Sequence, residues 1–296
     1  MNVQAVLVNF RNEAKTINCL RALERGTVKP RRVFVVDNSC TETSRAAFLK
    51  ESFDLDVEWI WNVANLGFAA GCNQGIRRSM EETPDDYVWL LNNDTEPTPT
   101  ALENLLKKAE QTCAGITGSA IYDSNGNFSG GVGLVHSKFA SVKRGSLQQP
   151  ERFDYIEGSS FLISPQCLAK IGPLSEDYFL YFEESDYCLK AKKAGLTLAW
   201  ATDSVITHHI GSSTGSEIRK GGVPFFIDCL MIRNRIHFAR SNGFPAYGFF
   251  VGLLISLGLR LKRGQFNRVV TILRIISSRN AFRNFIIKNG GFYDHV

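Results

Sequence analysis

Short apolar runs alternate with amphipathic segments along the first hundred residues of the chain. The apolar runs are rich in β-branched residues and predict buried strands at 3–10, 32–37, 58–61 and 87–91. The segments between them carry apolar residues at helical spacing and predict helices at 13–25, at 42–50 and up to about 82. Because strand and helix alternate at short spacing, we expect an α/β fold with a mostly parallel sheet.

The pattern changes after residue 97. Thr100 and Glu103 have the spacing of a capping box, which predicts a helix that runs to about 111. Short strands punctuated by Gly and Ser follow at 116–122 and 155–164, and they predict an antiparallel extension of the sheet with a loop-rich insertion near 126–133. The remaining elements predicted before residue 222 are a helix at 184–194 and two short strands at 197–201 and 205–208.

Beyond residue 222 the strand signal fades, and three helices are predicted at 224–240, 245–261 and 266–288. The stretch 241–259 carries no charge, and its length is near the roughly 20 residues that span a bilayer. Because Gly and Pro interrupt this stretch, we favour an interfacial or re-entrant helix followed by a basic amphipathic one. Whether 241–259 inserts into a membrane is left open. The chain thus divides into an α/β region, 1–222, and a helical region, 223–296.

Charge is unevenly spread along the chain. The formal net charge is +5, and the segment 241–296 holds eight Lys or Arg residues but one acid. Such a basic segment can meet an anionic membrane surface, whereas nucleic-acid binding is not expected because no recognisable module accompanies it. Seven scattered Cys without a C-x-x-C pair indicate a reduced, intracellular protein, and the N-terminus shows no signal-peptide pattern.

Four polar motifs follow predicted strands or begin a predicted helix. They are Asp37-Asn38-Ser39, the loop from Asn65 to Asn73, Asn92-Asn93-Asp94, and Phe182-Glu183-Glu184-Ser185-Asp186. In an open α/β sheet, ligands bind outside the carboxyl ends of the strands. We therefore expect the side chains that follow the strands to face one shared crevice.

In order and spacing, these four motifs resemble those of the inverting family 2 glycosyltransferases, over roughly residues 3–214. Within that family the chain is most similar to bacterial rhamnosyltransferases of O-antigen and cell-wall polysaccharide synthesis and to their galactofuranosyl relatives. The resemblance implies the GT-A fold, a nucleotide-binding α/β sheet fused to an acceptor-binding part. It makes 1–222 the catalytic domain and 223–296 a basic, membrane-associated helical region.

The resemblance also implies a binding site for a nucleotide-sugar donor. Asp37 and Asn38 match the positions at which the family holds the base and ribose of the nucleotide. The residues alone equally allow an Asx turn there. The glycine- and asparagine-rich loop lies along the nucleotide sugar. The donor-binding residues implied in this way are Asp37, Asn38, Asn65, Gly67, Gly71, Asn73, Asn92 and Asn93.

A divalent metal, Mg²⁺ or Mn²⁺, is implied by the match of residues 92–94 to the D-x-D motif of the family. Asn92 replaces the first acid of that motif, so Asp94 is the one strong ligand left. The family often has a His just after the late strand, which makes His208 or His209 a second ligand. His208 is preferred on spacing, and Mn²⁺ tolerates an imidazole better than Mg²⁺ does.

The acidic motif matches the family segment that supplies the catalytic base. On that alignment the base is Glu184, which takes a proton from the acceptor hydroxyl in one inverting displacement. Whether Glu183 or Asp186 shares this role is open, because the family usually has Asp where Glu184 stands. The alternative is a purely structural role, in which these acids only complement the dipole at the N-terminus of the helix.

Two weaker matches to the family accompany the four motifs. Residues 158–161 resemble a turn that precedes the acceptor pocket, and Arg233-Asn234 echoes an R-N pair in the C-terminal helices of the family. The aromatic side chains between 178 and 182 fit either a sugar-stacking wall or ordinary core around the catalytic helix.

The expected function is transfer of rhamnose from dTDP-rhamnose to a lipid-linked or polysaccharide acceptor. UDP-galactofuranose and other UDP-hexoses are alternative donors. The enzyme is expected on the cytoplasmic face of the inner membrane, bound peripherally, with its linkage and oligomeric state open. A non-catalytic sugar-nucleotide-binding or scaffold subunit is the alternative suggested by Asn92 and Glu184. A nicotinamide-dependent Rossmann enzyme is disfavoured because no G-x-G-x-x-G fingerprint is present.

Overall fold

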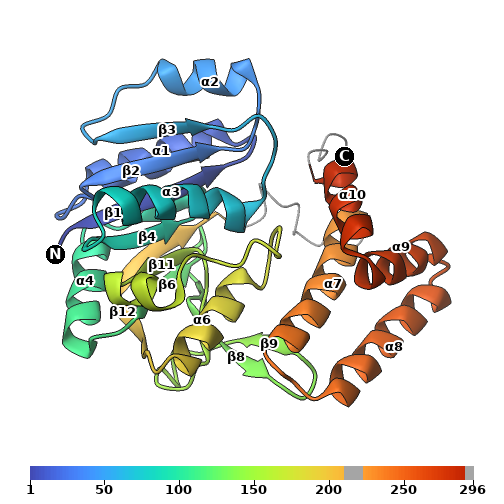
Figure 1. Cartoon of the computed structure of the whole chain (residues 1–296). Coiled ribbons are helices and arrows are strands. Elements are labelled where there is room, and N and C mark those ends of the chain that lie inside the picture. The colour runs from blue at the N-terminus through green and yellow to red at the C-terminus, as the bar shows by residue number, and fades with distance from the viewer. Residues whose placement is uncertain (210–222, 291–296) are drawn as a thin grey trace.

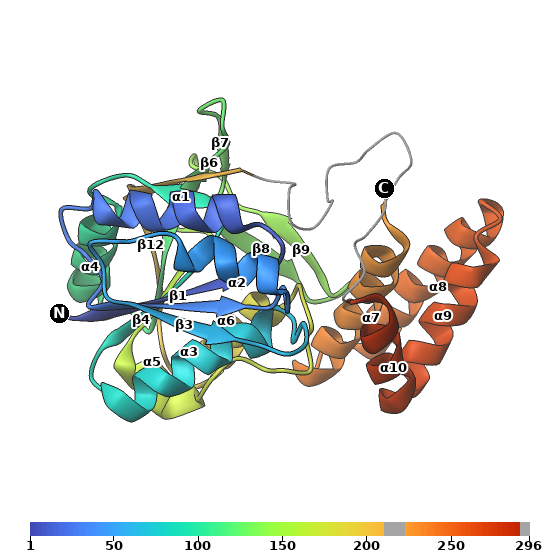
Figure 2. The same cartoon turned by 90° about the horizontal axis from the view of Figure 1, so that it is seen from above.

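The computed structural model describes residues 1–209 and 223–290, which form an α/β part and an array of C-terminal helices (Figure 1). The α/β part is built on a large sheet with the strand order β3-β2-β1-β4-β11-β6-β12-β5. Figure 2 shows the C-terminal helices beside this sheet, at the end opposite the N-terminus of the chain.

The first half of the sheet is parallel, as predicted. It contains β1 (Val3–Asn9), β2 (Arg32–Asp37), β3 (Val57–Trp61) and β4 (Tyr87–Leu91). The predicted helices between these strands are confirmed as α1 (Glu13–Glu24), α2 (Glu42–Leu49) and α3 (Phe68–Glu82).

Both faces of this sheet are covered by helices. Leu7 packs with α1 and with α4 (Ala101–Thr112), whereas its neighbour Val6 packs with α3 on the opposite face. Successive side chains of a strand point to opposite faces, so a strand buried on both faces reads as one continuous apolar run. The predicted helix at 100–111 is confirmed by α4, but the capping box is not formed. Thr100 makes no side-chain cap bond, and Glu103 accepts instead from the Thr27 hydroxyl.

The second half of the sheet holds the predicted antiparallel extension. In it β11 (Ser160–Ile163) lies antiparallel between β4 and β6 (Ile116–Tyr122), and β5 (Thr95–Pro97) forms an antiparallel edge. The strands predicted at 197–201 and 205–208 are one strand, β12 (Leu198–His208), whose register shifts between Ala201 and Val205.

The stretch between residues 126 and 164 differs from the prediction. Residues 155–164 form two strands, β10 (Tyr155–Ile156) and β11, which belong to different sheets. The predicted loop at 126–133 contains β7 (Phe128–Gly130) and the start of β8 (Val132–His136). β8 pairs with β10 and with β9 (Ser141–Arg144) in a small sheet that lies toward the C-terminal helices (Figure 1).

Two helices follow β11. A short helix, α5 (Pro165–Ile171), was not predicted, although Ser164 caps it and Pro165 opens it, which are ordinary helix-start signals. The predicted acidic helix is confirmed as α6 (Glu183–Lys193).

The C-terminal region is helical, as predicted, but has one helix more. α7 (Phe225–Ser241) and α8 (Ala246–Lys262) match the prediction, whereas 266–288 is divided into α9 (Phe266–Ser277) and α10 (Arg279–Asn289). The break lies at Ser278, whose backbone is extended and whose hydroxyl accepts from the backbone N–H of Ala281 to cap α10. Within 1–209 and 223–290, no helix is both long and apolar enough to cross a membrane.

A shared hydrophobic cluster joins the C-terminal helices to the α/β part. Tyr178, Phe179 and Phe182, which precede α6, are buried in one cluster with Phe238 of α7 and Phe285 of α10. The stretch from 178 to 182 is therefore held between the two parts of the molecule.

Candidate active site

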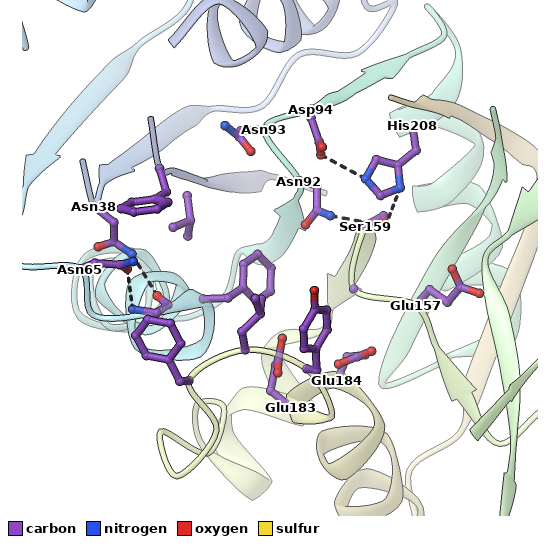
Figure 3. A pocket seen from close by; sticks show the side chains of 18 of the residues that line it. Asn38, Asn65, Asn92, Asn93, Asp94, Glu157, Ser159, Glu183, Glu184 and His208 are labelled. Carbon is purple, nitrogen blue, oxygen red and sulfur yellow. Dashed lines mark hydrogen bonds and ion pairs between the residues drawn. The ribbon is translucent and has the colours of Figure 1, made fainter. Parts of the chain in front are cut away.

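A cavity of about 510 Å³ lies at the carboxyl ends of the central strands (Figure 3). Eight of the predicted site residues line it, namely Asn38, Asn65, Gly67, Asn92, Asn93, Asp94, Glu184 and His208. Four do not line it, namely Asp37, Gly71, Asn73 and Asp186. The crevice expected at the strand ends is therefore present, with two thirds of the predicted side chains on its wall.

Asp94 and His208 form a polar pair on one wall. Asp94 follows β4 and directly precedes β5. His208 is the last residue of β12, and β12 pairs with β5. His208 Nε2 lies 3.1 Å from the Asp94 carboxylate, and His208 Nδ1 lies 3.3 Å from the Ser159 hydroxyl. His209 points elsewhere, toward Glu96 and Ser124. Of the two histidines considered, His208 is the one that the fold brings to Asp94.

The Asp94–His208 pair fits two ligands of one divalent ion. Neighbouring ligands at about 2.1 Å from an octahedral ion are about 3.0 Å apart, close to the 3.1 Å between the carboxylate oxygen and Nε2, which is also a normal hydrogen-bond distance. If Ser159 accepts from Nδ1, the lone pair of His208 is on Nε2, facing Asp94. Within the described ranges no third His, Cys, Asp or Glu joins them, so the remaining ligands would come from Asn92, substrate or water.

Two acids of α6 enter the cavity from the opposite side (Figure 3). Glu183 is 4% exposed, and the Oε2 atoms of Glu183 and Glu184 are buried without a hydrogen-bond partner in the described part of the chain. Burial, with the nearby carboxylate of Glu157, raises the pKa of Glu184 from 4.5 to about 7. Burial and then the charge of Glu184 raise the pKa of Glu183 well above its ordinary value. Both acids therefore hold their protons to higher pH than an exposed carboxyl does, and Glu184 is about half ionised near pH 7.

Asp186 is turned away from the cavity. Its carboxylate accepts from Asn242 Nδ2 at 2.9 Å and forms an ion pair with Lys190 Nζ at 2.8 Å. Lys190 lies on α6 itself, Asn242 directly follows α7, and Asp186 is 1% exposed. Of the three acids, Glu183 and Glu184 reach the site, and Asp186 attaches α6 to the C-terminal region.

The glycine-rich loop is closed by hydrogen bonds to its backbone. Asn38 Nδ2 donates to Gly67 O at 3.0 Å, and Gly67 N donates to Asn65 Oδ1 at 3.0 Å. Gly67 has a φ of +84°, and a Cβ there would lie 2.3 Å from Phe179 O. Only glycine therefore fits between this loop and the segment that precedes α6.

The predicted donor residues outside the cavity make internal contacts. Asp37 is 2% exposed and accepts from Asn9 Nδ2 and Ser39 N, which is the Asx-turn arrangement. A Cβ on Gly71 would lie 3.0 Å from the Val8 side chain, so this glycine lets α3 approach β1.

Asn73 exchanges two hydrogen bonds with the backbone of Leu174, and Nδ2 also donates to Glu176. The structure thus brings neither Gly71 nor Asn73 to the cavity wall. Asn93 lines the cavity but also donates to Thr16 Oγ1 at 2.8 Å.

Two charged residues of the cavity wall, Glu157 and Arg144, were not predicted from the sequence. Glu157 lies in the break between β10 and β11, where burial raises its pKa and the charge of Arg144 opposes that rise. Arg144 ends β9, and no other Lys or Arg in the described ranges lines the cavity. No motif marks either residue, because both reach the site through pairing of the small sheet. Among the aromatic residues before α6, Phe179 and Tyr181 line the cavity, whereas Tyr178 and Phe182 are core.

Several relatives of the chain are named as sugar transferases. A dTDP-rhamnosyl transferase RfbF of Shigella flexneri is 22% identical over 94% of this chain and 90% of its own length. An N-acetylglucosaminyl-diphospho-decaprenol L-rhamnosyltransferase of Mycobacterium tuberculosis is 26% identical over 67% of this chain and 73% of its own length. The chain spans 64% of a hexosyltransferase Agl10 of Haloferax volcanii, at 24% identity.

Solved structures with the same fold include a mannosyltransferase of Pyrobaculum calidifontis in complex with GDP-Man and Mn²⁺. It matches with a TM-score of 0.56 at 14% identity over 97% of this chain and 84% of its own. GalNAc-T7 with UDP, GalNAc and Mn²⁺ matches with a TM-score of 0.60 at 12% identity, over 81% of this chain and 48% of its own. The fold is therefore GT-A. The family model for glycosyl transferase family 2 matches residues 5–165, and the chain belongs to that family.

Proposed function

We propose that this protein is an inverting glycosyltransferase that uses a carboxylate base and a divalent metal. The observation that carries the proposal is the opposition of two kinds of side chain across one cavity. Glu184 enters from the start of α6, and the Asp94–His208 pair lies at the ends of β4 and β12 (Figure 3). The acceptor hydroxyl would lie beside the Glu184 carboxylate, and the donor diphosphate would lie beside the Asp94–His208 pair. The anomeric carbon of the donor would then lie between the two.

Glu184 is the proposed general base. A pKa of about 7 places its proton affinity near working pH, where a base is both ionised and able to accept a proton. The acceptor hydroxyl gives its proton to the carboxylate as the acceptor oxygen bonds to the anomeric carbon. The bond from that carbon to the diphosphate oxygen breaks, the electron pair leaves with the nucleotide, and the configuration inverts.

Asp94 and His208 are the proposed metal ligands, with Ser159 holding the imidazole orientation. A bound Mg²⁺ or Mn²⁺ would neutralise the charge that develops on the departing diphosphate. The imidazole favours Mn²⁺ of the two. Two structural neighbours, GalNAc-T7 and the Pyrobaculum calidifontis mannosyltransferase, hold Mn²⁺, which supports a divalent ion here.

The proposed donor is dTDP-rhamnose, with UDP-galactofuranose or another UDP-hexose as the alternative. Two relatives are named as rhamnosyltransferases, and one of them is matched over nearly its full length. Asn38, Asn65 and Gly67 would border the nucleotide, since they line the cavity beside the strand ends. Asp37 is proposed to support this region through its turn with Ser39.

The proposed acceptor is a polyprenyl-linked glycan at the cytoplasmic face of the inner membrane. α8 carries a row of exposed apolar side chains at helical spacing, formed by Tyr247, Phe250, Val251, Leu254, Ile255 and Leu259. Six basic residues of α8 to α10 are also exposed, although Arg260 and Arg268 are not free because both pair with Asp228. An exposed apolar row beside exposed cations fits an interfacial helix on an anionic bilayer.

The proposed function is tested by incubating the full chain with dTDP-rhamnose, MnCl₂ and a synthetic N-acetylglucosaminyl-diphospho-lipid. Mass spectrometry should show one deoxyhexose added to the lipid, and none with Asp94→Ala. A panel of UDP-sugars run in parallel identifies the alternative donors. If a nucleotide sugar raises the melting temperature but no donor and acceptor pair gives transfer, the scaffold-subunit function suggested by Asn92 replaces this one.

A further inference from the structure

The segment that precedes the proposed base has an unusual backbone. Tyr181 and Phe182 have φ values of +73° and +76°, and both are non-glycine residues in the left-handed region. Glu183 follows directly as the first residue of α6. Such conformations persist only where the surroundings hold them. We refer to residues 177–182 as the pre-α6 turn.

Asn234 of α7 holds this turn by its side-chain amide. Its Nδ2 donates to Leu180 O at 2.9 Å and to Tyr181 O at 3.2 Å. Its Oδ1 accepts from Arg233 Nη1 at 3.1 Å, and the residue is 0% exposed. All three polar contacts of the amide are therefore made inside the protein, two of them with backbone carbonyls of the turn.

Arg233 fixes the other end of the same turn. Its guanidinium donates to Asp177 O at 2.6 Å and lies over the Phe282 ring of α10, 3.7 Å from the centroid. Burial lowers its pKa to about 10, so the guanidinium stays charged at neutral pH. The adjacent pair on α7 thus binds three carbonyls between residues 177 and 181.

We infer that Asn234 is a positioning residue for the carboxylate of Glu184. By holding the carbonyls of Leu180 and Tyr181 it keeps the turn left-handed, and the first turn of α6 then directs Glu183 and Glu184 into the cavity. The inference rests on the proposed role of Glu184 as base. It makes α7 part of the catalytic machinery, although α7 contributes no residue to the cavity wall.

The first test measures the turn itself and needs no substrate. Hydrogen–deuterium exchange of the full chain is compared for the native protein, Asn234→Ala and Asn234→Asp. Asp keeps the shape of the side chain but has no N–H to donate. Exchange at 180–186 should become about tenfold faster in both variants. Unchanged exchange there, or equal acceleration throughout the chain, would overturn the inference. The matched control is Asn104→Ala on α4, which removes the hydrogen bond that Asn104 Nδ2 donates to Asp203 O.

The second test measures rates with dTDP-rhamnose and the N-acetylglucosaminyl-diphospho-lipid. Asn234→Asp should lower kcat 10- to 100-fold and leave the KM for the donor within twofold. The acidic limb of the pH profile should move to lower pH, because a relaxed turn hydrates Glu184 and lowers its pKa. If kcat and the limb are both unchanged while Glu184→Gln is inactive, the positioning role fails and the base stands. Full activity in Glu184→Gln would instead reject the base.

Discussion

Replacing Glu184 by Gln should make the protein more stable and less active at the same time. The folded state raises the pKa of this carboxyl from 4.5 to about 7 through burial and through the charge of Glu157. The folded chain therefore holds the proton more tightly than the unfolded chain does. The resulting stabilisation is fully present below pH 4.5 and is lost as the pH rises through 7.

The size of the effect follows from these two values. The difference between 4.5 and about 7 corresponds to about 3 kcal/mol of unfolding free energy that native Glu184 loses on ionisation. Gln has nearly the same shape and never ionises, so Glu184→Gln should be about 3 kcal/mol more stable than the native protein at pH 8. At pH 4.5 the gain should be only a few tenths of a kcal/mol. Burial is the larger cause of the raised pKa of Glu183 and the charge of Glu184 the smaller, so Glu184→Gln removes only the smaller cause.

The assay is urea unfolding at pH 4.5 and pH 8, combined with a transfer assay. Transfer should fall by about 10²- to 10⁴-fold, which is the usual contribution of a general base. Glu110→Gln is the control, since Glu110 is exposed on α4 and its substitution should change neither quantity. A stability gain that is equal at the two pH values, or absent, would show that Glu184 is not held in a low-polarity site, and the reasoning would be refuted.

The remaining predictions concern the other walls of the site and the surface of α8. Asp94→Asn should lower the Mn²⁺-dependent stabilisation by a nucleotide sugar by at least about 1.4 kcal/mol, a tenfold loss of affinity, measured by thermal shift. Arg144→Ala should raise the KM for a diphosphate-linked acceptor about tenfold with little change for the donor, because this residue is the only Lys or Arg lining the cavity in the described ranges. Leu254→Glu should lower the affinity for anionic vesicles, measured by sedimentation, more than tenfold. Gln111→Glu makes the same charge change at an exposed position of α4 and should not lower that affinity.

The local pattern of the sequence was sufficient for the parallel half of the fold. Within β2, residues 33–36 are apolar throughout because they are buried on both faces of the sheet, and polar turn residues mark where the strand ends. The carboxyl ends of parallel strands meet at one edge, so Asn38, Asn92 and Asp94 could be predicted to share a crevice. His208 joined them because β12 pairs with the strand that follows Asp94.

The parts that could not be predicted depend on contacts between distant segments. Residues 155–164 carry one apolar pattern, yet β10 and β11 pair with different sheets, and the break between them delivers Glu157 to the cavity. The direction of a side chain on a helix is equally non-local. Asn73 was predicted to face the donor but bonds the backbone of Leu174, 101 residues away, and no pattern near Asn73 encodes that contact.

The two faces of the C-terminal helices have separable consequences. The inner face binds the pre-α6 turn through Arg233 and Asn234, and the outer row on α8 is exposed. Deleting residues 241–296 would therefore remove both the proposed membrane surface and Phe285, which covers the cluster around the turn. Loss of activity on truncation could not distinguish a membrane role from a positioning role. Leu254→Glu and Asn234→Asp can, because the first should reduce vesicle binding with kcat on a soluble acceptor unchanged, and the second should do the reverse.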